Sequence, residues 1–280
     1  MVAGALHSKL DHMREALRSY GRVGVAFSGG VDSALVLKVA VETLGAENVL
    51  AVTGVSSSLA RRELVAAKEL AESMGVRHLL VDPGEFGDQS YLANPTNRCY
   101  FCKSALYDKM DAILAAHGLL VAVNGTNVDD LGDHRPGLEA AKEHGVRSPC
   151  VDAGLGKAEI RALSAEMGLP TSDKPASPCL SSRVPYGHDI TPEKLRMIER
   201  AENFLHDLGI RECRVRHHDT LARIEVLPPW IERLSAPEMR TRIDAAFREF
   251  GYQHVTVDLR GFRSGSLNEV IAFGKRQVIS

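Results

Sequence analysis

The sequence predicts an α/β protein, in which a parallel β-sheet domain is followed by a smaller α+β domain. Between residues 22 and about 180, short apolar segments alternate with helical patterns, as is typical of a parallel sheet whose strands are connected by helices. The first apolar segment leads into the glycine-containing turn 28–33, and a helical pattern follows at once. After residue 191 the pattern changes, because two apolar segments follow each other as a hairpin. We therefore expect two domains, at 1–185 and 186–280.

The elements of the first domain each have a local signal. Apolar side chains recur at helical spacing near the N-terminus, glycines end the expected helices, and polar loops follow the expected strands. The expected strands lie at 23–27, 48–54, 77–82 and 119–124. The expected helices lie at about 34–45, 58–74, 102–117, 138–143 and 157–167. We expect a polar loop at 83–97, because this segment contains glycine and proline.

The second domain begins after a proline-rich segment. Three prolines within nine residues predict that 170–187 is a loop. Thr191 and Pro192 have the residue types of an N-cap and a first helical position, for a helix that runs to about residue 208. The remaining elements are expected as strands at 212–217 and 221–226, a helix at 237–250 and a strand at 254–259. We expect His217 and His218 to be surface or capping residues.

Composition excludes several classes of protein. The net charge is −2, from 34 basic and 36 acidic residues, which does not favour binding to nucleic acid or to a membrane surface. No apolar run approaches the roughly 20 residues that span a bilayer, and the N-terminal segment lacks the pattern of a signal peptide. The five cysteines are an odd number in a chain without an export signal, so we expect reduced thiols and a cytoplasmic protein.

The turn 28–33 has the features of a phosphate site. A strand, a glycine-rich turn and a helix start together present free backbone N–H groups at the positive end of a helix dipole. Gly29 and Gly30 permit close approach of a ligand to the backbone, and Ser28, Asp32 and Ser33 add polar side chains. The alternative is an ordinary strand-to-helix turn.

This turn is not a Walker loop. The sequence contains no G-x-x-x-x-G-K-[ST] motif, and Gly156-Lys157 is followed by Ala158 in place of the hydroxyl residue that Mg²⁺ requires. The residues Ser-Gly-Gly-Val-Asp-Ser instead resemble the PP-loop of the ATP pyrophosphatase superfamily, whose members bind ATP and release pyrophosphate.

A second polar loop follows the expected strand at 119–124. Asp129, Asp130 and Asp133 lie within five positions. Such a cluster can hold a Mg²⁺ ion that neutralises the charge of a triphosphate. Ligands bind at the carboxyl ends of the strands in open α/β sheets, so this loop and 53–58 are expected beside the turn 28–33. The alternative is a solvated loop with capping aspartates.

The cysteines raise a separate question. Cys99 and Cys102 form a C-x-x-C pair, which fits a redox dithiol, a zinc site or an iron–sulfur site, and Cys179 lies in the proline-rich loop. Three thiolates suit an iron–sulfur cluster with one open iron position. We expect Cys150 and Cys213, in apolar surroundings or on a strand, to be packing residues.

Five motifs occur together in order, and they carry a more specific resemblance. They are Ser-Gly-Gly-Val-Asp-Ser at 28–33, Arg-Cys-Tyr-Phe-Cys-Lys at 98–103, Asn-Gly-Thr-Asn-Val-Asp-Asp at 124–130, Arg-Pro-Gly at 135–137 and Ser-Pro-Cys-Leu-Ser-Ser-Arg at 177–183. With the arginine strand around 214–216, they make nearly the whole chain similar to the LarE family, whose members transfer sulfur at the expense of ATP to build the nickel-pincer cofactor of lactate racemase.

The resemblance implies a substrate and a set of ligands. The family acts on a pyridinium dicarboxylate mononucleotide, which implies that Arg183, Arg214 and Arg216 bind its carboxylates and phosphate. Arg214 and Arg216 alternate on an expected strand and so point to one face, although basic residues on an exposed strand are the plainer alternative. Glu202 and Glu225 are weaker candidates for the metal or substrate site. The implied ATP and Mg²⁺ site comprises Ser28, Gly29, Gly30, Asp32, Ser33, Gly125 and Asp130.

The family offers two sulfur donors. In one version the cysteine at Cys179 gives up its own sulfur once, and in the other three cysteines hold a [4Fe-4S] cluster that carries a sulfide. Because Cys99 and Cys102 accompany Cys179 here, we expect the cluster, together with a separate sulfide source and a homo-oligomer. The main alternative function is a tRNA thiolase of the same superfamily, which predicts an RNA-binding module and a basic face, neither of which the sequence contains.

Overall fold

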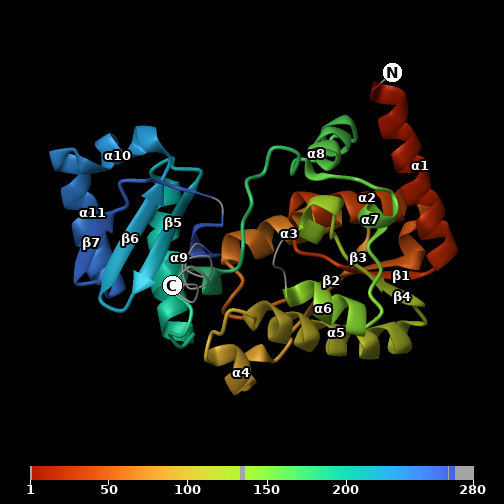
Figure 1. Ribbon diagram of the computed structural model, residues 1–280, viewed down its shortest axis with the longest axis horizontal. Helices are drawn as coiled ribbons and strands as arrows, with labels where there is room; N and C mark the ends of the chain where they lie inside the picture. The colour runs from red at the N-terminus through yellow and green to blue at the C-terminus, as the bar shows by residue number, and fades with distance from the viewer. Residues whose placement is uncertain (1, 133–135, 264, 269–280) are drawn as a thin grey trace, which may run out of the picture. The chain divides into compact units, whose positions relative to one another are not determined.

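The chain forms two compact units, each of which is described by itself. The computed structural model describes residues 2–132, 136–263 and 265–268 (Figure 1). The first unit comprises Met1–Tyr91 and Asn97–Ser177, and the second comprises Leu92–Thr96 and Pro178–Ser280. The first contains a parallel sheet flanked by helices and the second a smaller mixed sheet, which confirms the predicted fold class.

The four strands of the first unit are all parallel, as predicted. They are β1 (Val23–Ala26), β2 (Val49–Gly54), β3 (Arg77–Val81) and β4 (Val121–Val123), in the spatial order β3-β2-β1-β4. Val23 pairs with both Val49 and Val121, so the carboxyl ends of β1, β2 and β4 lie at one edge of the sheet. The loops after β1 and β4 are therefore neighbours, although about a hundred residues separate them in the sequence.

Both faces of the sheet are buried at β1 and β2. Side chains alternate between the two faces along a strand. Val23, Val25 and Ala51 belong to one apolar cluster, whereas Leu50 and Val52 belong to the other. The first face is covered by the helices α1 (Val2–Tyr20), α2 (Val31–Leu44), α3 (Arg61–Ser73), α7 (Pro149–Asp152) and α8 (Lys157–Glu166). Helices α5 (Arg98–His117) and α6 (Pro136–Glu143) lie on the opposite face (Figure 1).

Several local predictions in the first unit differ from the structure. Helix α5 begins at Arg98 and not at residue 102, so Cys99, which was expected before the helix, lies with Cys102 inside its first turns. The expected loop 83–97 contains the one-turn helix α4 (Gln89–Leu92), and α7 was not predicted. Helices of one turn show too few residues for a helical period to be recognised in the sequence.

The second unit is built on a hairpin. Strands β5 (Cys213–His218) and β6 (Leu221–Val226) are antiparallel, and β7 (His254–Val257) lies parallel to β6. Helices α9 (Pro192–Asp207), α10 (Pro228–Ser235) and α11 (Pro237–Phe250) complete the unit, and α10 was not predicted. The predicted cap of α9 is confirmed, because the Lys194 backbone N–H donates to the Thr191 hydroxyl at 3.3 Å.

The prediction for His217 is wrong. Its side chain is 3% exposed and its ring lies 5.5 Å from that of Tyr252. Burial, with the nearby charge of Lys194, lowers the pKa of His217 to about 4, so the buried ring is neutral at pH 7. Strand β5 is buried on both faces, and a strand of that kind does not show the polar alternation that would mark an exposed side chain.

Within the described residues, no helix is long and apolar enough to cross a membrane.

Candidate functional site

The turn 28–33, the PP-loop, connects β1 to α2 and is closed by its own side chains. The Ser28 backbone N–H donates to Ser33 Oγ at 3.2 Å, and that hydroxyl donates to the Gly30 carbonyl at 3.2 Å. Gly29 has a φ of 70°, and a Cβ there would lie 2.9 Å from Ala67 Cβ of α3. Glycine is thus required at Gly29 for both backbone conformation and space.

Asp32, in the first turn of α2, is held by donors from two distant segments. Asn127 Nδ2 donates to Oδ1 at 3.2 Å, and Lys157 Nζ donates to Oδ2 at 2.5 Å. Sequence reasoning placed Asp32 in the site but missed Asn127 and Lys157. The motif is local, whereas these donors arrive from the loop after β4 and from the start of α8.

The loop after β4 packs directly on the helix start of the PP-loop. A Cβ on Gly125 would lie 2.7 Å from the Ser33 backbone nitrogen and 3.0 Å from the Asp32 carbonyl carbon. Asp130 Oδ2 accepts the Asn127 backbone N–H at 3.1 Å. The structure therefore brings Gly125 and Asp130 to the PP-loop side of the sheet, as the sequence predicted.

Replacement of Gly125 with alanine should disturb this packing. The new Cβ meets backbone atoms, which cannot move aside as a flexible side chain can, so the PP-loop must shift. A displacement of about 1 Å at a reacting centre can cost roughly 100-fold in rate, and we expect ATP-dependent pyrophosphate release to fall by at least about tenfold.

Gly87→Ala is the matched control, because a Cβ there meets nothing within 4 Å. Its pyrophosphate release should remain at the wild-type rate. Equal rates for Gly125→Ala and wild-type protein would show that the close approach of the two loops is not needed.

The carboxylates of this loop also serve as local caps. Asp129 Oδ2 accepts the Lys157 backbone N–H at 2.6 Å, at the N-terminus of α8. Asp133 lies outside the described residues. Among the described residues there is no group of three or more His, Cys, Asp or Glu side chains arranged to hold a metal ion.

A second lysine contacts the PP-loop. Lys174 Nζ donates to the Gly29 carbonyl at 3.1 Å and pairs with Glu63 Oε2 at 2.7 Å. Lys174 lies in the proline-rich loop, where the sequence offered no spacing that would connect it to the turn.

Of the three cysteines predicted as iron ligands, two belong to the first unit and one to the second. Cys99 and Cys102 lie in the first turns of α5 in the first unit, three residues apart and so on one side of the helix. Cys179 immediately precedes the short 3₁₀ helix Leu180–Arg183 in the second unit, and its side chain is exposed, as is that of Cys99. Cys150 and Cys213 are fully buried, which confirms the prediction that they are packing residues.

Arg183 forms a buried ion pair beside Cys179. Its Nε and Nη2 donate to the two carboxylate oxygens of Glu202, both at 2.9 Å, and its Nη1 donates to the Cys179 carbonyl at 3.1 Å. Burial alone would lower the pKa of Arg183, but the Glu202 carboxylate raises it above its ordinary value. Burial likewise opposes ionisation of Glu202, but Arg183 and Arg214 hold the pKa of its carboxyl below the ordinary value.

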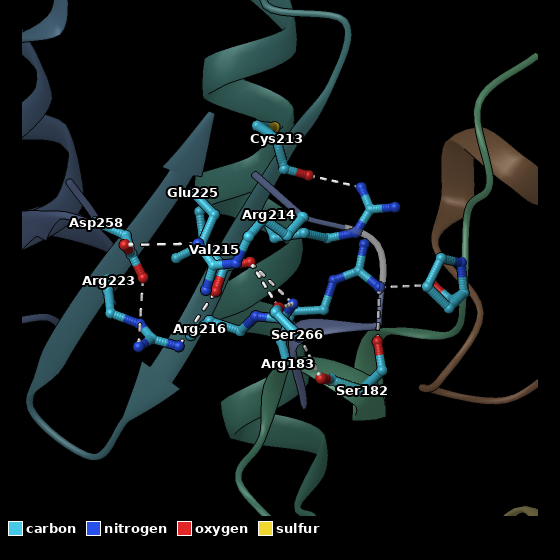
Figure 2. A network of polar contacts seen from close by, with 12 residues as sticks. Ser182, Arg183, Cys213, Arg214, Val215, Arg216, Arg223, Glu225, Asp258 and Ser266 are labelled. Carbon is cyan, nitrogen blue, oxygen red and sulfur yellow. Dashed lines mark hydrogen bonds and ion pairs between the residues drawn. The ribbon is translucent and has the colours of Figure 1, made fainter. Parts of the chain in front are cut away.

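The strand arginines are also buried. Arg216, 6% exposed, donates to the Ser182 carbonyl at 2.7 Å and to Glu225 Oε2 at 2.9 Å (Figure 2). Arg214, 8% exposed, lies over the Phe262 ring, and burial together with the charge of Arg183 lowers its pKa to about 10. The alternative of basic residues on an exposed strand is therefore wrong.

These contacts form one network around the Cys179 loop. Arg183, Arg214 and Arg216 are brought together with the weaker candidates Glu202 and Glu225, all within the second unit. Arg223 adds a fourth guanidinium, 3.1 Å from Glu225 Oε1. Arg223 also pairs with Asp258 at 3.5 Å, so four guanidinium groups face three carboxylates, and the excess positive charge suits an anionic ligand.

Comparison with known proteins agrees with these features. The NAD synthase family profile matches residues 6–89, the part of the chain that contains the PP-loop. An uncharacterized protein of Synechocystis sp. is 46% identical over 95% of this chain and 99% of its own length. An uncharacterized protein of Methanocaldococcus jannaschii is 28% identical over 87% of this chain and 91% of its own length.

A characterised relative identifies the family. The pyridinium-3,5-bisthiocarboxylic acid mononucleotide synthase of Lactiplantibacillus plantarum is 37% identical over 95% of this chain and 96% of its own length. Such coverage includes both units, and the PP-loop match supplies the ATP-using part. The chain belongs to the LarE family of ATP-dependent sulfurtransferases, within the PP-loop ATP pyrophosphatase superfamily.

Proposed function

We propose that this protein converts the carboxylates of pyridinium-3,5-biscarboxylic acid mononucleotide into thiocarboxylates, for a nickel-pincer cofactor. The observation that carries the proposal is the full-length similarity to the Lactiplantibacillus plantarum synthase. A carboxylate is a poor electrophile, so ATP first provides a leaving group. The substrate carboxylate attacks the α-phosphorus, and an acyl-adenylate forms as pyrophosphate leaves.

The first unit would carry out this activation. The PP-loop N–H groups and the hydroxyls of Ser28 and Ser33 would contact the phosphates, and Asp32 and Asp130 would hold Mg²⁺. Gly125 would keep the two loops in contact, as its close approach to Ser33 supports. Phosphoryl chemistry of this kind asks the protein mainly to position groups and neutralise charge.

The second unit would bind the substrate and present the sulfur. Arg183, Arg214 and Arg216 would face its carboxylates and phosphate, and the hydrogen bond from Arg183 to the Cys179 carbonyl links these arginines to the thiol. We also expect the second unit to take part in a homo-oligomer.

For the sulfur donor we propose a three-thiolate iron–sulfur site at Cys99, Cys102 and Cys179. Thiolates are the ligands that such a cluster takes, Cys99 and Cys179 are exposed, and Cys102 shares one helix side with Cys99. When bound, a [4Fe-4S] cluster with an open iron would supply a transferable sulfide. The alternative is a sacrificial Cys179, whose Sγ attacks the acyl carbon as AMP leaves. Loss of the Cα proton and cleavage of Cβ–Sγ would then leave dehydroalanine.

Anaerobic reconstitution separates the two donors. Wild-type protein should bind iron and sulfide with visible absorbance, Cys99→Ala should lose both, and Cys150→Ala, which alters a buried packing residue, should retain them. Reconstituted wild-type protein without iron would overturn the cluster. Loss of sulfur from the Cys179 peptide after one turnover would then support the alternative.

The activity itself is tested by the choice of substrate. Purified protein with ATP and Mg²⁺ should release pyrophosphate in the presence of the pyridinium mononucleotide and not in the presence of tRNA. Release that depends on tRNA would replace the proposed function with a tRNA thiolase.

A further inference from the structure

A short segment that begins at the end of α4 belongs to the second unit, although the chain on both sides of it belongs to the first. Residues Leu92–Thr96 are grouped with the C-terminal part of the chain. The chain therefore crosses from the second unit to the first after Thr96, and from the first unit to the second after Ser177. Cys99 lies three residues beyond the first of these crossings, and Cys179 lies two residues beyond the other.

Asn94 holds this segment through its side chain, which is 0% exposed. Its amide nitrogen Nδ2 donates to three backbone carbonyl groups, those of Pro185 at 2.7 Å, His188 at 3.1 Å and Val184 at 3.3 Å. The backbone adds to this attachment, because the Gly187 N–H donates to the Asn94 carbonyl at 3.0 Å. Asn94 thus ties the segment to residues 184–188, which follow the Cys179 loop.

The backbone of Asn94 is strained. Its φ is 51°, and Pro95 follows it. A positive φ is uncommon for a residue other than glycine, and a proline restricts the residue before it to extended backbone. Strain of this kind persists only where the surrounding contacts over-determine the conformation. The hydrogen bonds from Asn94 to residues 184–188 supply such contacts, which makes Asn94 a candidate for a positional function.

Both exposed cysteines are connected to Asn94 by short lengths of chain. Five positions separate Asn94 from Cys99, a distance of at most about 18 Å even in a fully extended chain. Pro95 stiffens this connection, and helix α5 begins at its far end. On the other side, Arg183 donates to the Cys179 carbonyl at 3.1 Å and directly precedes the residues that accept from Asn94. The position of each thiol therefore depends on the contacts of Asn94.

We infer that Asn94 is a positioning residue, whose amide holds the chain before Cys99 against the chain after Cys179 and so keeps the two thiols within reach of one iron–sulfur cluster. This inference rests on the proposed function, because it serves the three-thiolate site. Without the amide, three carbonyl groups lose their donor and the strained backbone at Asn94 is free to relax. The start of α5 would then lose its fixed position relative to the Cys179 loop. Residues that orient metal ligands in this indirect way typically contribute about 10- to 100-fold to metal affinity.

The first test titrates anaerobically reconstituted protein with an iron chelator. Asn94→Gly removes the amide and accepts the positive φ, whereas Asn94→Asp keeps the size of the side chain but replaces the donor with a carboxylate. Both variants should hold iron at least about tenfold more weakly than wild type. Ile243→Ala, in the apolar core of the second unit, is the control for general destabilisation and should hold iron as wild type does. The fluorescence of Trp230 during urea unfolding shows that each variant is folded and how far each is destabilised.

The second test needs no iron. In metal-free Cys102→Ala protein, a short bis-maleimide can join Cys99 to Cys179, whereas the remaining cysteines are fully buried. Mass spectrometry of chains that migrate as monomers counts the cross-links made within one chain. Asn94→Gly and Asn94→Asp should each lower this yield several-fold, and Ile243→Ala should leave it unchanged.

Each outcome has one meaning. Wild-type iron affinity and cross-linking in a folded Asn94→Gly or Asn94→Asp protein would overturn the inference, because the amide would then not be needed. Equal losses in Ile243→Ala would also overturn it, since they would come from destabilisation alone. Wild-type protein that binds no iron would instead refute the proposed iron–sulfur site, and the cross-link would still decide whether Asn94 positions the two cysteines.

Discussion

Cys179→Ser protein is expected to release pyrophosphate from ATP and the pyridinium substrate, but to form no thiocarboxylate above background. The PP-loop, where we propose the activation step, belongs to the first unit, and Cys179 belongs to the second. Serine is close to cysteine in size, so the Arg183 contact with the backbone at residue 179 should persist. A hydroxyl, however, neither donates sulfur nor serves as a soft ligand to iron.

The measurement follows pyrophosphate and thiocarboxylate separately under single-turnover conditions. Cys213→Ala is the matched control, because Cys213 is a fully buried cysteine in the same unit, and it should retain both products. Thiocarboxylate formation by Cys179→Ser would contradict both proposed sulfur donors, the iron–sulfur cluster and the sacrificial Cys179. Loss of pyrophosphate in Cys179→Ser alone would place Cys179 in the activation step.

The same experiment with Cys99→Ala distinguishes the donors. A sacrificial Cys179 needs no second cysteine, so Cys99→Ala should still complete one turnover on that route. With a three-thiolate site, Cys99→Ala should resemble Cys179→Ser.

The sequence predicted the first sheet well because its signals are local. Strands β1, β2 and β4 are short apolar runs that end in glycine or polar loops, and buried parallel strands have this appearance. The turn 28–33 was recognised for the same reason, since its conformation depends on adjacent glycine and serine residues. The one-turn helices α4 and α7 were missed because four residues do not define a period.

The partners of the site could not be predicted in this way. Asn127 and Lys157 reach Asp32 only because β4 lies beside β1 in the sheet, an order that no local pattern specifies. The burial of Arg183 and Arg216 was also missed. Charged residues indicate an exposed surface unless their carboxylate partners are known, and Glu202 and Glu225 lie 19 and 9 positions away.

Glu202→Ala should destabilise the protein more than the cysteine and glycine substitutions described above. Glu202 lies on the buried side of α9 and accepts from Arg183 and from the Val215 backbone N–H at 2.9 Å. Removing one partner of a buried ion pair leaves the other charge uncompensated, which typically costs about 3–5 kcal/mol. Glu193→Ala is the control, because its pair with Arg196 on the same helix is exposed, and such pairs contribute at most about 1 kcal/mol.

Trp230 makes the measurement specific to the second unit. It is the single tryptophan of the sequence and packs against the apolar core of that unit, so its fluorescence during urea unfolding reports on the unit that contains Glu202. Equal midpoints for Glu202→Ala and Glu193→Ala would contradict the expected cost. The double variant Arg183→Met with Glu202→Leu should recover much of the loss, since apolar side chains can replace a buried pair. That recovery would show that the loss comes from an uncompensated charge.

The ion pair between Arg183 and Glu202 also predicts how the unfolding free energy depends on pH. Burial opposes ionisation of Glu202, but Arg183 and the other donors prevail and hold its pKa below the ordinary value. A carboxyl with a lowered folded-state pKa contributes stability that is fully present above its unfolded pKa, about 4.3. That contribution is lost as the pH falls through the folded value. The difference in unfolding free energy between wild type and Glu202→Ala should therefore be constant from neutral pH to about pH 5 and should shrink below about pH 4. A difference that grows on acidification would mean that the folded protein raises the pKa of Glu202, which would contradict the ion pair with Arg183.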